Sequence, residues 1–275
     1  MFQRLASRSG WHLLALFGAA LALGPFVWML SSSVKESGAI FAYPPQLIPA
    51  RIRWDNFAYV IQETSFLLFM RNTVFIAGMS MLGQLFCCSL AGFAFARLAF
   101  PYKNVLFWSL MAALIIPPQV TLVPTFILVK YLNWLDTYYP IIIPWFLAGA
   151  IGTFLFRQFF KLIPQDLDDA ATIDGCGPYR LFLYIYLPLS GPVIATVAVF
   201  SLVAQWNNLL GPVIYLSTEE KFPITMGLAS FVTEYTAKWN ILMAANLLSI
   251  VPVVLLYFFL QRYFVEGMLT SGIRQ

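Results

Sequence analysis

The chain has 275 residues, of which 60% are apolar and only 10% are charged, and its mean hydropathy is +0.78. An ordinary soluble domain carries about 25% charged residues, so this composition excludes that class and indicates a polytopic membrane protein. The net charge of +4 comes without a run of Lys and Arg or a basic helix face, so we expect no nucleic acid as a partner.

Six apolar stretches are long enough to cross a bilayer as helices. A helix needs about 20 residues to span ~30 Å of hydrocarbon. The predicted spans are residues 11–33, 72–96, 105–130, 139–160, 192–217 and 241–264. We therefore predict an all-α membrane protein with six transmembrane helices, forming a single domain over residues 1–275.

The basic residues predict the orientation of these spans. Placing the N-terminus inside puts most Lys and Arg residues on the cytoplasmic side, including the wholly basic connection from Arg97 to Lys103. Both termini are then cytoplasmic. Residues 34–70 form an external loop, in which residues 56–69 are predicted to include a short interfacial helix, and residues 163–189 form a cytoplasmic loop.

Prolines and small residues occur inside the spans. The prolines are expected to break the third to sixth spans, at Pro117, Pro118, Pro124, Pro140, Pro144, Pro212 and Pro252, where neighbouring helices or a wet cavity must satisfy the freed carbonyls. Small residues four positions apart predict close helix packing, at Cys88, Gly92 and Ala96 in the second span and at Ala148 and Gly152 in the fourth.

Amide side chains within the spans are the candidates for a substrate pathway. An unpaired amide in hydrocarbon costs about 2 kcal/mol or more, so each must meet another helix or a solute. The candidates, with the tryptophan beside them, are Gln119, Gln205, Trp206, Asn207, Asn208 and Asn246. The run from Gln205 to Asn208 favours a solute contact most, because an aromatic ring beside several amides is suited to holding a polar solute.

The cytoplasmic loop, residues 163–189, is the most polar segment of the chain. Its acidic residues are Asp166, Asp168, Asp169 and Asp174. Pro164 is predicted to occupy the first position of a helix, whose first turns carry three of these carboxylates at the positive end of the helix dipole. Leu167, Ala170 and Ala171 predict a narrow apolar stripe on that helix.

A turn and a second short helix are predicted to follow. Gly175 can adopt positive φ and stop the first helix, while Asp174 either caps the turn or meets a cation of a partner. Pro178 can begin the second helix, which Pro188 is expected to close. Its apolar face consists of Leu181, Phe182 and Ile185. The sequence thus predicts a helix, a glycine turn and a helix along the membrane surface.

The stretch DDAATIDGCGPYRLFLYIYLPLSGP resembles the EAA motif of permeases of ATP-binding cassette (ABC) importers. Other segments are similar to carbohydrate permeases of the maltose-type family, namely NTVFIAGMS, LAGFAFARLAFPYKNVLF, VPTFILVKYLNWLDTYYPIIIP, QWNNLLGPVIYL and QRYFVEGMLTSGIRQ. The resemblance therefore covers nearly the whole chain.

This resemblance implies that the chain is a permease subunit whose cytoplasmic loop docks an ATPase. The docking residues that it implies are Asp168, Asp169, Ala170, Ala171, Asp174, Gly175, Ile185 and Pro188. Asp169 stands where the motif has glutamate and would pair with a basic residue of the ATPase. Cys176 replaces a usual alanine and Arg274 a usual lysine, but charge and size class are kept, so we expect the dock to be retained.

The resemblance also implies the partners. They are a cytoplasmic ABC ATPase dimer, a second and non-identical permease subunit, an external solute-binding protein and membrane lipid. The chain has no GxxxxGK[ST] loop, so we expect ATP and Mg on the ATPase and no cofactor on this chain. Its three cysteines and one histidine offer little material for a metal site.

The expected function is import of a carbohydrate. Permeases of the same class for a polyol, glycerol phosphate or an amino acid are the alternatives. An ion-coupled secondary carrier needs ionisable residues along its spans, and these spans have few. A membrane-embedded enzyme needs a constellation of catalytic groups that the sequence does not contain.

Overall fold

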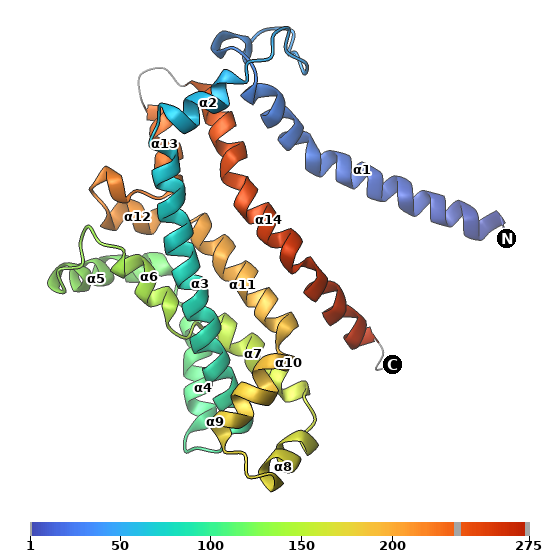
Figure 1. Cartoon of the computed structure of the whole chain (residues 1–275), viewed down its shortest axis with the longest axis vertical. Helices are drawn as coiled ribbons and strands as arrows, with labels where there is room; N and C mark the ends of the chain where they lie inside the picture. The colour runs from blue at the N-terminus through green and yellow to red at the C-terminus, as the bar shows by residue number, and fades with distance from the viewer. Residues whose placement is uncertain (1, 234–237, 273–275) are drawn as a thin grey trace. The chain divides into compact units, whose positions relative to one another are not determined.

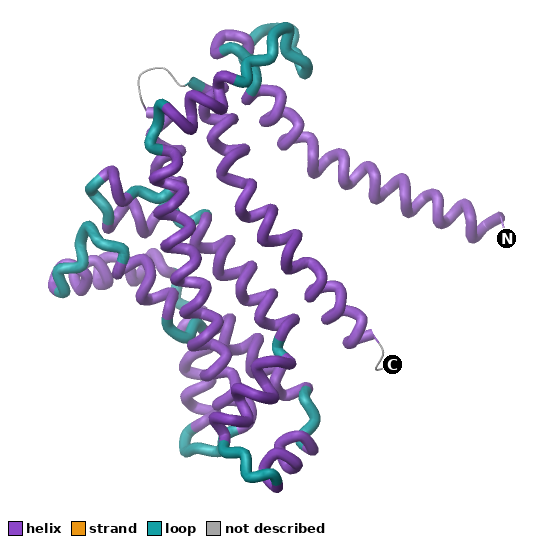
Figure 2. The backbone as a smooth tube through the Cα atoms, viewed as in Figure 1, coloured by secondary structure: helices purple, strands orange, loops and turns teal. Residues whose placement is uncertain are grey.

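The computed structural model describes residues 2–233 and 238–272, and for residues 2–10, 232–233 and 263–272 the backbone alone (Figure 1). Within these ranges the chain consists of helices and their connecting loops, without a strand (Figure 2). The predicted all-α class is confirmed.

Among the described residues, four helical segments are long and apolar enough to cross a membrane on their own. They are Trp11–Ser33 within α1 (Phe2–Ser33), α3 (Phe66–Arg97), Tyr139–Leu162, which joins α6 (Tyr139–Phe146) and α7 (Ala150–Leu162), and Trp239–Arg262 within α14 (Trp239–Gly272). Two further spans are bent pairs. Counting each pair as one span gives the six that the sequence predicts.

The first bent pair replaces the straight span predicted over residues 105–130. α4 (Lys103–Ala112), extended as a tight turn to Ile115, meets α5 (Pro118–Tyr131) at 101°. Ile116 and Pro117 between them are extended, because the ring of a following proline disfavours helical backbone. The third span is therefore broken where two of its prolines lie.

The second bent pair begins in the cytoplasmic loop of the prediction. Its first arm, Pro178–Leu189, consists of α9 (Pro178–Leu181), a π-helical turn (Phe182–Tyr186) and α10 (Leu187–Leu189), and it meets α11 (Gly191–Trp206) at 79°. The helix predicted to continue to residue 217 ends at Trp206 and restarts as α12 (Leu210–Tyr215).

Not every proline breaks its helix. Pro124 lies inside α5 and Pro252 inside the continuous α14, so the predicted breaks at these two positions are wrong. Pro144 lies within α6, and the break of the fourth span comes after it, at residues 147–149. There Gln84 of α3 donates hydrogen bonds to the carbonyls of Trp145 (2.7 Å) and Leu147 (3.2 Å), which an interrupted helix leaves unpaired.

Contacts divide the chain into two compact units. The first combines Met1–Leu67 with Gly227–Val251. Its buried Asn56, on α2 (Asp55–Gln62), donates to the carbonyls of Ser33 (2.7 Å) and Lys35 (2.9 Å) and accepts from Asn240 (3.1 Å). The short helix predicted over residues 56–69 is therefore α2, although residues 66–69 already belong to α3.

The second unit combines Leu68–Met226 with Pro252–Gln275. Its core is aromatic: Tyr186 is fully buried, with its ring centroid 5.0 Å from that of Phe93 and 5.3 Å from that of Phe160. A Cβ atom on Gly92 would lie 2.5 Å from the Cβ of Phe156, so α3 and α7 touch at this glycine. The close packing predicted from the small residues is confirmed.

Candidate functional site

The two-helix loop, residues 163–189, folds as helix, turn and helix. α8 (Asp166–Ile173) ends in a Schellman motif, in which Cys176 N–H donates to the carbonyl of Ala171 (2.9 Å) and Gly175 N–H to that of Thr172 (3.1 Å). Gly175 has φ of +76°, as the sequence predicted, and Pro178 begins α9. Pro164, in contrast, lies two residues before α8, and Pro188 lies inside α10 instead of ending the helix.

One face of α8 is tied to the end of α3 and to the second arm of the loop. The carboxylate of Asp168 accepts a hydrogen bond from the hydroxyl of Tyr186 (2.5 Å) and lies 3.5 Å from Nη1 of Arg97, at the end of α3. Nη2 of Arg97 donates to the carbonyls of Phe160 (2.7 Å) and Ile163, at the end of α7. Arg97 therefore joins α3, α7 and α8 through a single side chain that is 13% exposed.

The opposite face of α8 is uncovered. Among the implied docking residues, the exposed ones are Asp169, Ala170, Asp174, Gly175 and Pro188; Ile185 and Asp168 are half-buried, and Ala171 is buried. The apolar stripe is only partly confirmed, since Leu167 is 40% exposed and Ile173 beside the turn is 87% exposed. Asp168 already has two partners within the chain, so Asp169 and Asp174 are the exposed carboxylates among the implied docking residues.

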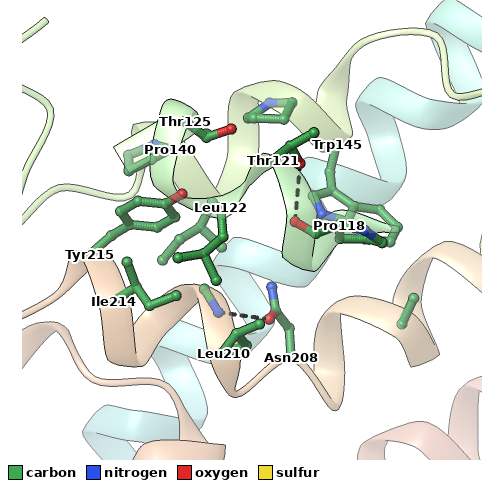
Figure 3. A pocket seen from close by; sticks show the side chains of 14 residues that line it. Pro118, Thr121, Leu122, Thr125, Pro140, Trp145, Asn208, Leu210, Ile214 and Tyr215 are labelled. Carbon is green, nitrogen blue, oxygen red and sulfur yellow. Dashed lines mark hydrogen bonds between the residues drawn. The ribbon is translucent and has the colours of Figure 1, made fainter. Parts of the chain in front are cut away.

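A pocket of about 350 Å³ lies between α5, α6, the end of α11 and α12. Figure 3 shows Tyr215 at one end and Trp145 at the other, with the hydroxyls of Thr121 and Thr125 on α5. Asn208 supplies an amide at the wall. The sequence therefore predicted one lining residue, Asn208, but neither aromatic ring nor either threonine.

The remaining amides of the predicted pathway lie elsewhere. Gln205 is 4% exposed and donates to Ser80 (2.9 Å) and to the carbonyl of Ile141 (3.0 Å), so it joins three helices. Trp206 is buried, and Asn207 is exposed and bonds to the Val203 carbonyl of its own helix. Gln119 is exposed on α5, and Asn246 bonds to the Leu242 carbonyl in the first unit.

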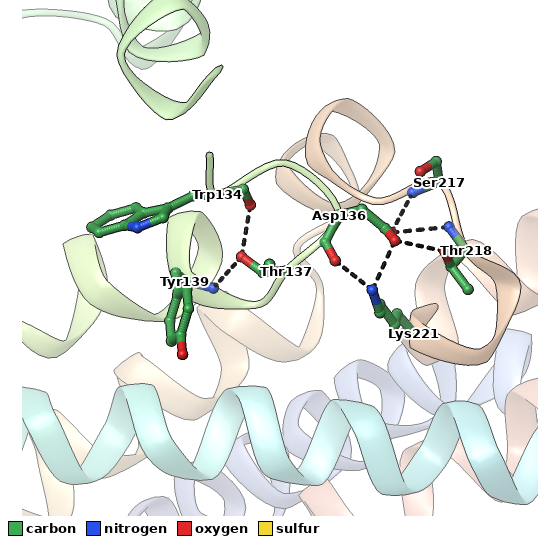
Figure 4. Close-up of polar contacts among 7 residues, drawn as sticks. All are labelled: Trp134, Asp136, Thr137, Tyr139, Ser217, Thr218 and Lys221. Atoms are coloured by element: carbon green, nitrogen blue, oxygen red, sulfur yellow. Dashed lines mark hydrogen bonds and ion pairs between the residues drawn. The ribbon is translucent and has the colours of Figure 1, made fainter. Parts of the chain in front are cut away.

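The Asp136 cluster consists of Asp136, Ser217, Thr218 and Lys221, and it joins the loop after α5 to the segment after α12 (Figure 4). The carboxylate of Asp136 accepts from the N–H groups of Ser217 and Thr218, both at 3.0 Å, from the Thr218 hydroxyl at 2.6 Å and from the Lys221 ammonium at 2.7 Å. These donors, the ammonium first, hold the pKa of Asp136 well below its usual value.

The same cluster is connected to the pocket. The N–H of Asp136 donates to the carbonyl of Tyr215 at 2.8 Å, and the side chain of Tyr215 lines the pocket. Asp136 has a φ of 55°, a conformation that Asp and Asn adopt more readily than most residues. That preference for turns was the only sequence signal for this cluster.

Known proteins match this chain over most of its length. A family described as "binding-protein-dependent transport system inner membrane component" matches residues 88–270. The arabinooligosaccharides transport system permease protein of Halalkalibacterium halodurans is 34% identical, over 94% of this chain and 93% of that protein. The sn-glycerol-3-phosphate transport system permease protein of Yersinia pestis is 33% identical, over 94% of this chain and 95% of that protein.

Solved structures show the same fold. A chain of a bacterial ABC transporter involved in the import of the acidic polysaccharide alginate superimposes with a TM-score of 0.81 at 23% identity, over 95% of this chain and 97% of that one. A chain of the alginate transporter in complex with a pentasaccharide-bound periplasmic protein gives a TM-score of 0.66 at 18% identity, over 92% and 93%.

Proposed function

The chain belongs to the family of inner membrane components of binding-protein-dependent transport systems, and from that premise we propose that it is a permease subunit of an ATP-driven carbohydrate importer. The observation that carries the proposal is the two-helix loop, whose inner face pairs through Asp168 with Arg97 at the end of α3 and whose outer face is uncovered. Arg97 also bonds to the end of α7. A loop built in this way transmits motion from a partner to the spans. The arabinooligosaccharides permease among the relatives supports carbohydrate as the class of solute.

In this proposal the loop lies in the cytoplasm and docks a dimer of ABC ATPases, which holds ATP and Mg. Arg97, Lys103 and Arg157 all donate to carbonyls at the end of the second unit that carries the loop. Basic residues concentrate on the cytoplasmic side of membrane proteins, so in this proposal this end of the second unit faces the cytoplasm. Six spans would put both termini on the same side as the loop.

The outward residues of α8 are then the docking contacts. Asp169 and Asp174 present carboxylates to basic groups of the ATPase, and Ala170 and Ile173 supply short and apolar contacts between them. Asp168 and Ala171 act from the inner face, where they hold α8 in place. Ile185 and Pro188 belong to the second arm that connects α8 to α11.

The remaining partners follow from the same proposal. A second permease subunit completes the pathway, and an external solute-binding protein delivers the carbohydrate. Both contact this chain within the lipid bilayer or at its outer surface, and no nucleic acid takes part. ATP binding brings the two ATPases together, the loop moves with them, and the spans open alternately to the two sides.

The test is ATP-driven uptake by vesicles that contain this chain with its ATPase, second permease and binding protein. We expect Asp169→Ala to weaken co-purification of the ATPase and to lower uptake about tenfold, because an ion pair at an interface is lost. Asp166→Ala is the matched control, since it removes the same charge from an exposed position on the same helix outside the motif. Uptake by the wild-type chain without any ATPase would refute the proposal.

A further inference from the structure

The residues that line the pocket between α5, α6 and α12 indicate the charge of the solute that it accepts, an inference that rests on the proposed function. Its volume of about 350 Å³ is at the lower end of the ~300–1,000 Å³ range of ligand pockets, which suits a ring or two of a saccharide better than a long peptide. All fourteen residues that line it are uncharged.

The lining combines aromatic rings with neutral hydrogen-bonding groups. Trp145 is 38% exposed at one end of the pocket and Tyr215 lies at the other (Figure 3), so two aromatic surfaces are available for the apolar faces of sugar rings. The Thr121 hydroxyl donates to the carbonyl of Pro118 (3.0 Å) and so keeps its oxygen lone pairs for a solute donor.

Asn208 is held in a fixed orientation with part of its hydrogen-bonding capacity left over. Its amide nitrogen donates to Oε1 of Gln205 (2.8 Å), and its oxygen accepts from Gly211 N–H (3.2 Å). An amide group has two N–H donors and two acceptor lone pairs, so one of each remains. A free donor beside a free acceptor matches a hydroxyl, which can both accept and donate.

Lys221, the cation of the Asp136 cluster that is bonded to the Tyr215 backbone, is already neutralised. Lys221 donates to both the carboxylate (2.7 Å) and the carbonyl (2.6 Å) of Asp136, whose N–H bonds to Tyr215. A phosphate or carboxylate that entered the pocket would lose water without gaining a cation. The desolvation of an unpaired ion costs several kcal/mol, and the neutral groups of this lining do not offset that cost.

We propose that this pocket binds the rings of an uncharged saccharide and rejects phosphorylated and uronic acid solutes. The solute of this chain would thus share the charge of the neutral solute named in the arabinooligosaccharides permease. It would differ from the anion named in the sn-glycerol-3-phosphate permease. Selection by charge occurs in this subunit, independently of the binding protein.

The test measures binding directly on the complete transporter in lipid nanodiscs without the binding protein. Saturation-transfer NMR is recorded with a neutral pentose trisaccharide, with sn-glycerol-3-phosphate and with an alginate trisaccharide. We expect transfer to the neutral trisaccharide alone. Asn208→Ala and Trp145→Leu should each weaken its binding about tenfold, and Thr125→Val, which keeps the shape of the side chain, about threefold.

Asn207→Ala is the matched control for Asn208→Ala, because Asn207 is the same residue type one position earlier and does not line the pocket. We expect it to bind as the wild type does. The converse variant Thr121→Lys should gain binding of sn-glycerol-3-phosphate, whereas Thr121→Asp should not.

Three results overturn the inference: no transfer to the neutral trisaccharide, binding of an anionic solute that Trp145→Leu abolishes, or pocket variants that all bind like the wild type. ATP-driven uptake in the same preparation separates this failure from that of the proposed function. If uptake is present while the pocket results fail, only the inference falls.

Discussion

Replacing Tyr186 by phenylalanine isolates the hydrogen bond that ties α8 to the second arm of the two-helix loop. The ring stays where it is, fully buried between Phe93 and Phe160, and only the hydroxyl that donates to Asp168 is lost. A hydrogen bond to a charged group contributes about 1.5–3 kcal/mol. Because Asp168 is only 18% exposed on its side chain and keeps the Arg97 contact, we expect a loss of about 2 kcal/mol in the free energy of unfolding.

The unfolding measurement is denaturant titration of the purified chain in detergent micelles, with a double-mutant cycle of Tyr186→Phe and Asp168→Ala. We expect an interaction energy of about 1–3 kcal/mol between the two sites. Tyr184→Phe is the matched control, since Tyr184 lies in the same π-helical turn but is 75% exposed. Additive effects of the two substitutions, or a change below about 0.5 kcal/mol for Tyr186→Phe, would refute the reasoning.

The same variant tests whether the bond serves transport. In the reconstituted importer, a loosened α8 should transmit less of the ATPase motion to α3 and α7, so more ATP is hydrolysed for each solute imported. We expect this ratio to rise about threefold or more in Tyr186→Phe while the ATPase still co-purifies. If the ratio of ATP hydrolysed to solute imported is unchanged despite the loss of stability, the bond has only a structural role.

Three further substitutions test other contacts. Asp136→Asn should flatten the dependence of unfolding free energy on pH. Because the pKa of Asp136 is lowered in the fold, its stabilisation is present above the ordinary pKa of 3.8 and is lost as pH falls toward the folded pKa. The wild type should therefore lose stability below about pH 4 more steeply than the variant, and identical pH profiles would contradict this. Gly92→Ala should cost about 1–3 kcal/mol of unfolding free energy, because the new Cβ meets Phe156 at 2.5 Å, whereas Gly78→Ala on the same helix meets nothing within 4 Å and should be tolerated. Gly175→Ala should cost about 1 kcal/mol from its φ of +76°, measured against Gly177→Ala with a φ of −72°, and equal stabilities of the two would argue against the turn.

Local chemistry made much of the fold predictable. Apolar length located the spans, and the glycine turn between α8 and α9 followed from Gly175 and Pro178 alone. The contact at Gly92 was also predictable, because a small residue at every fourth position lets a neighbouring helix approach closely. These features depend on a few residues close together in sequence.

The arrangement around Asp168 was not predictable in the same way. Asp168 and Asp169 are chemically equivalent neighbours, and the partners that hold Asp168 inward, Arg97 and Tyr186, come from other helical segments. The basic side chain at the end of an apolar span was a usable signal, since a partly buried guanidinium needs acceptors. Tyr186 gave no such signal, because a tyrosine among apolar residues reads as core.

The pocket escaped prediction for a related reason. Its walls come from α5, α6 and α12, and the angles between these helices depend on breaks at Ile116, Leu147 and Asn207 whose positions the prolines only approximate. The amides stood out in the sequence, yet the amide of Gln205 is hydrogen-bonded to Ser80 and to the Ile141 carbonyl. Most of the amides singled out in the sequence form bonds within the chain and do not line the pocket.

Tyr215 belongs to two features at once. Its side chain lines the pocket, and its carbonyl receives the N–H of Asp136, whose carboxylate fixes the segment after α12. If a solute in the pocket displaces Tyr215, it also displaces the backbone partner of Asp136, and thermodynamic reciprocity then requires the surface segment to change solute binding by the same free energy. A protein that binds the surface segment and a solute that binds the pocket would sense each other through one residue, without touching.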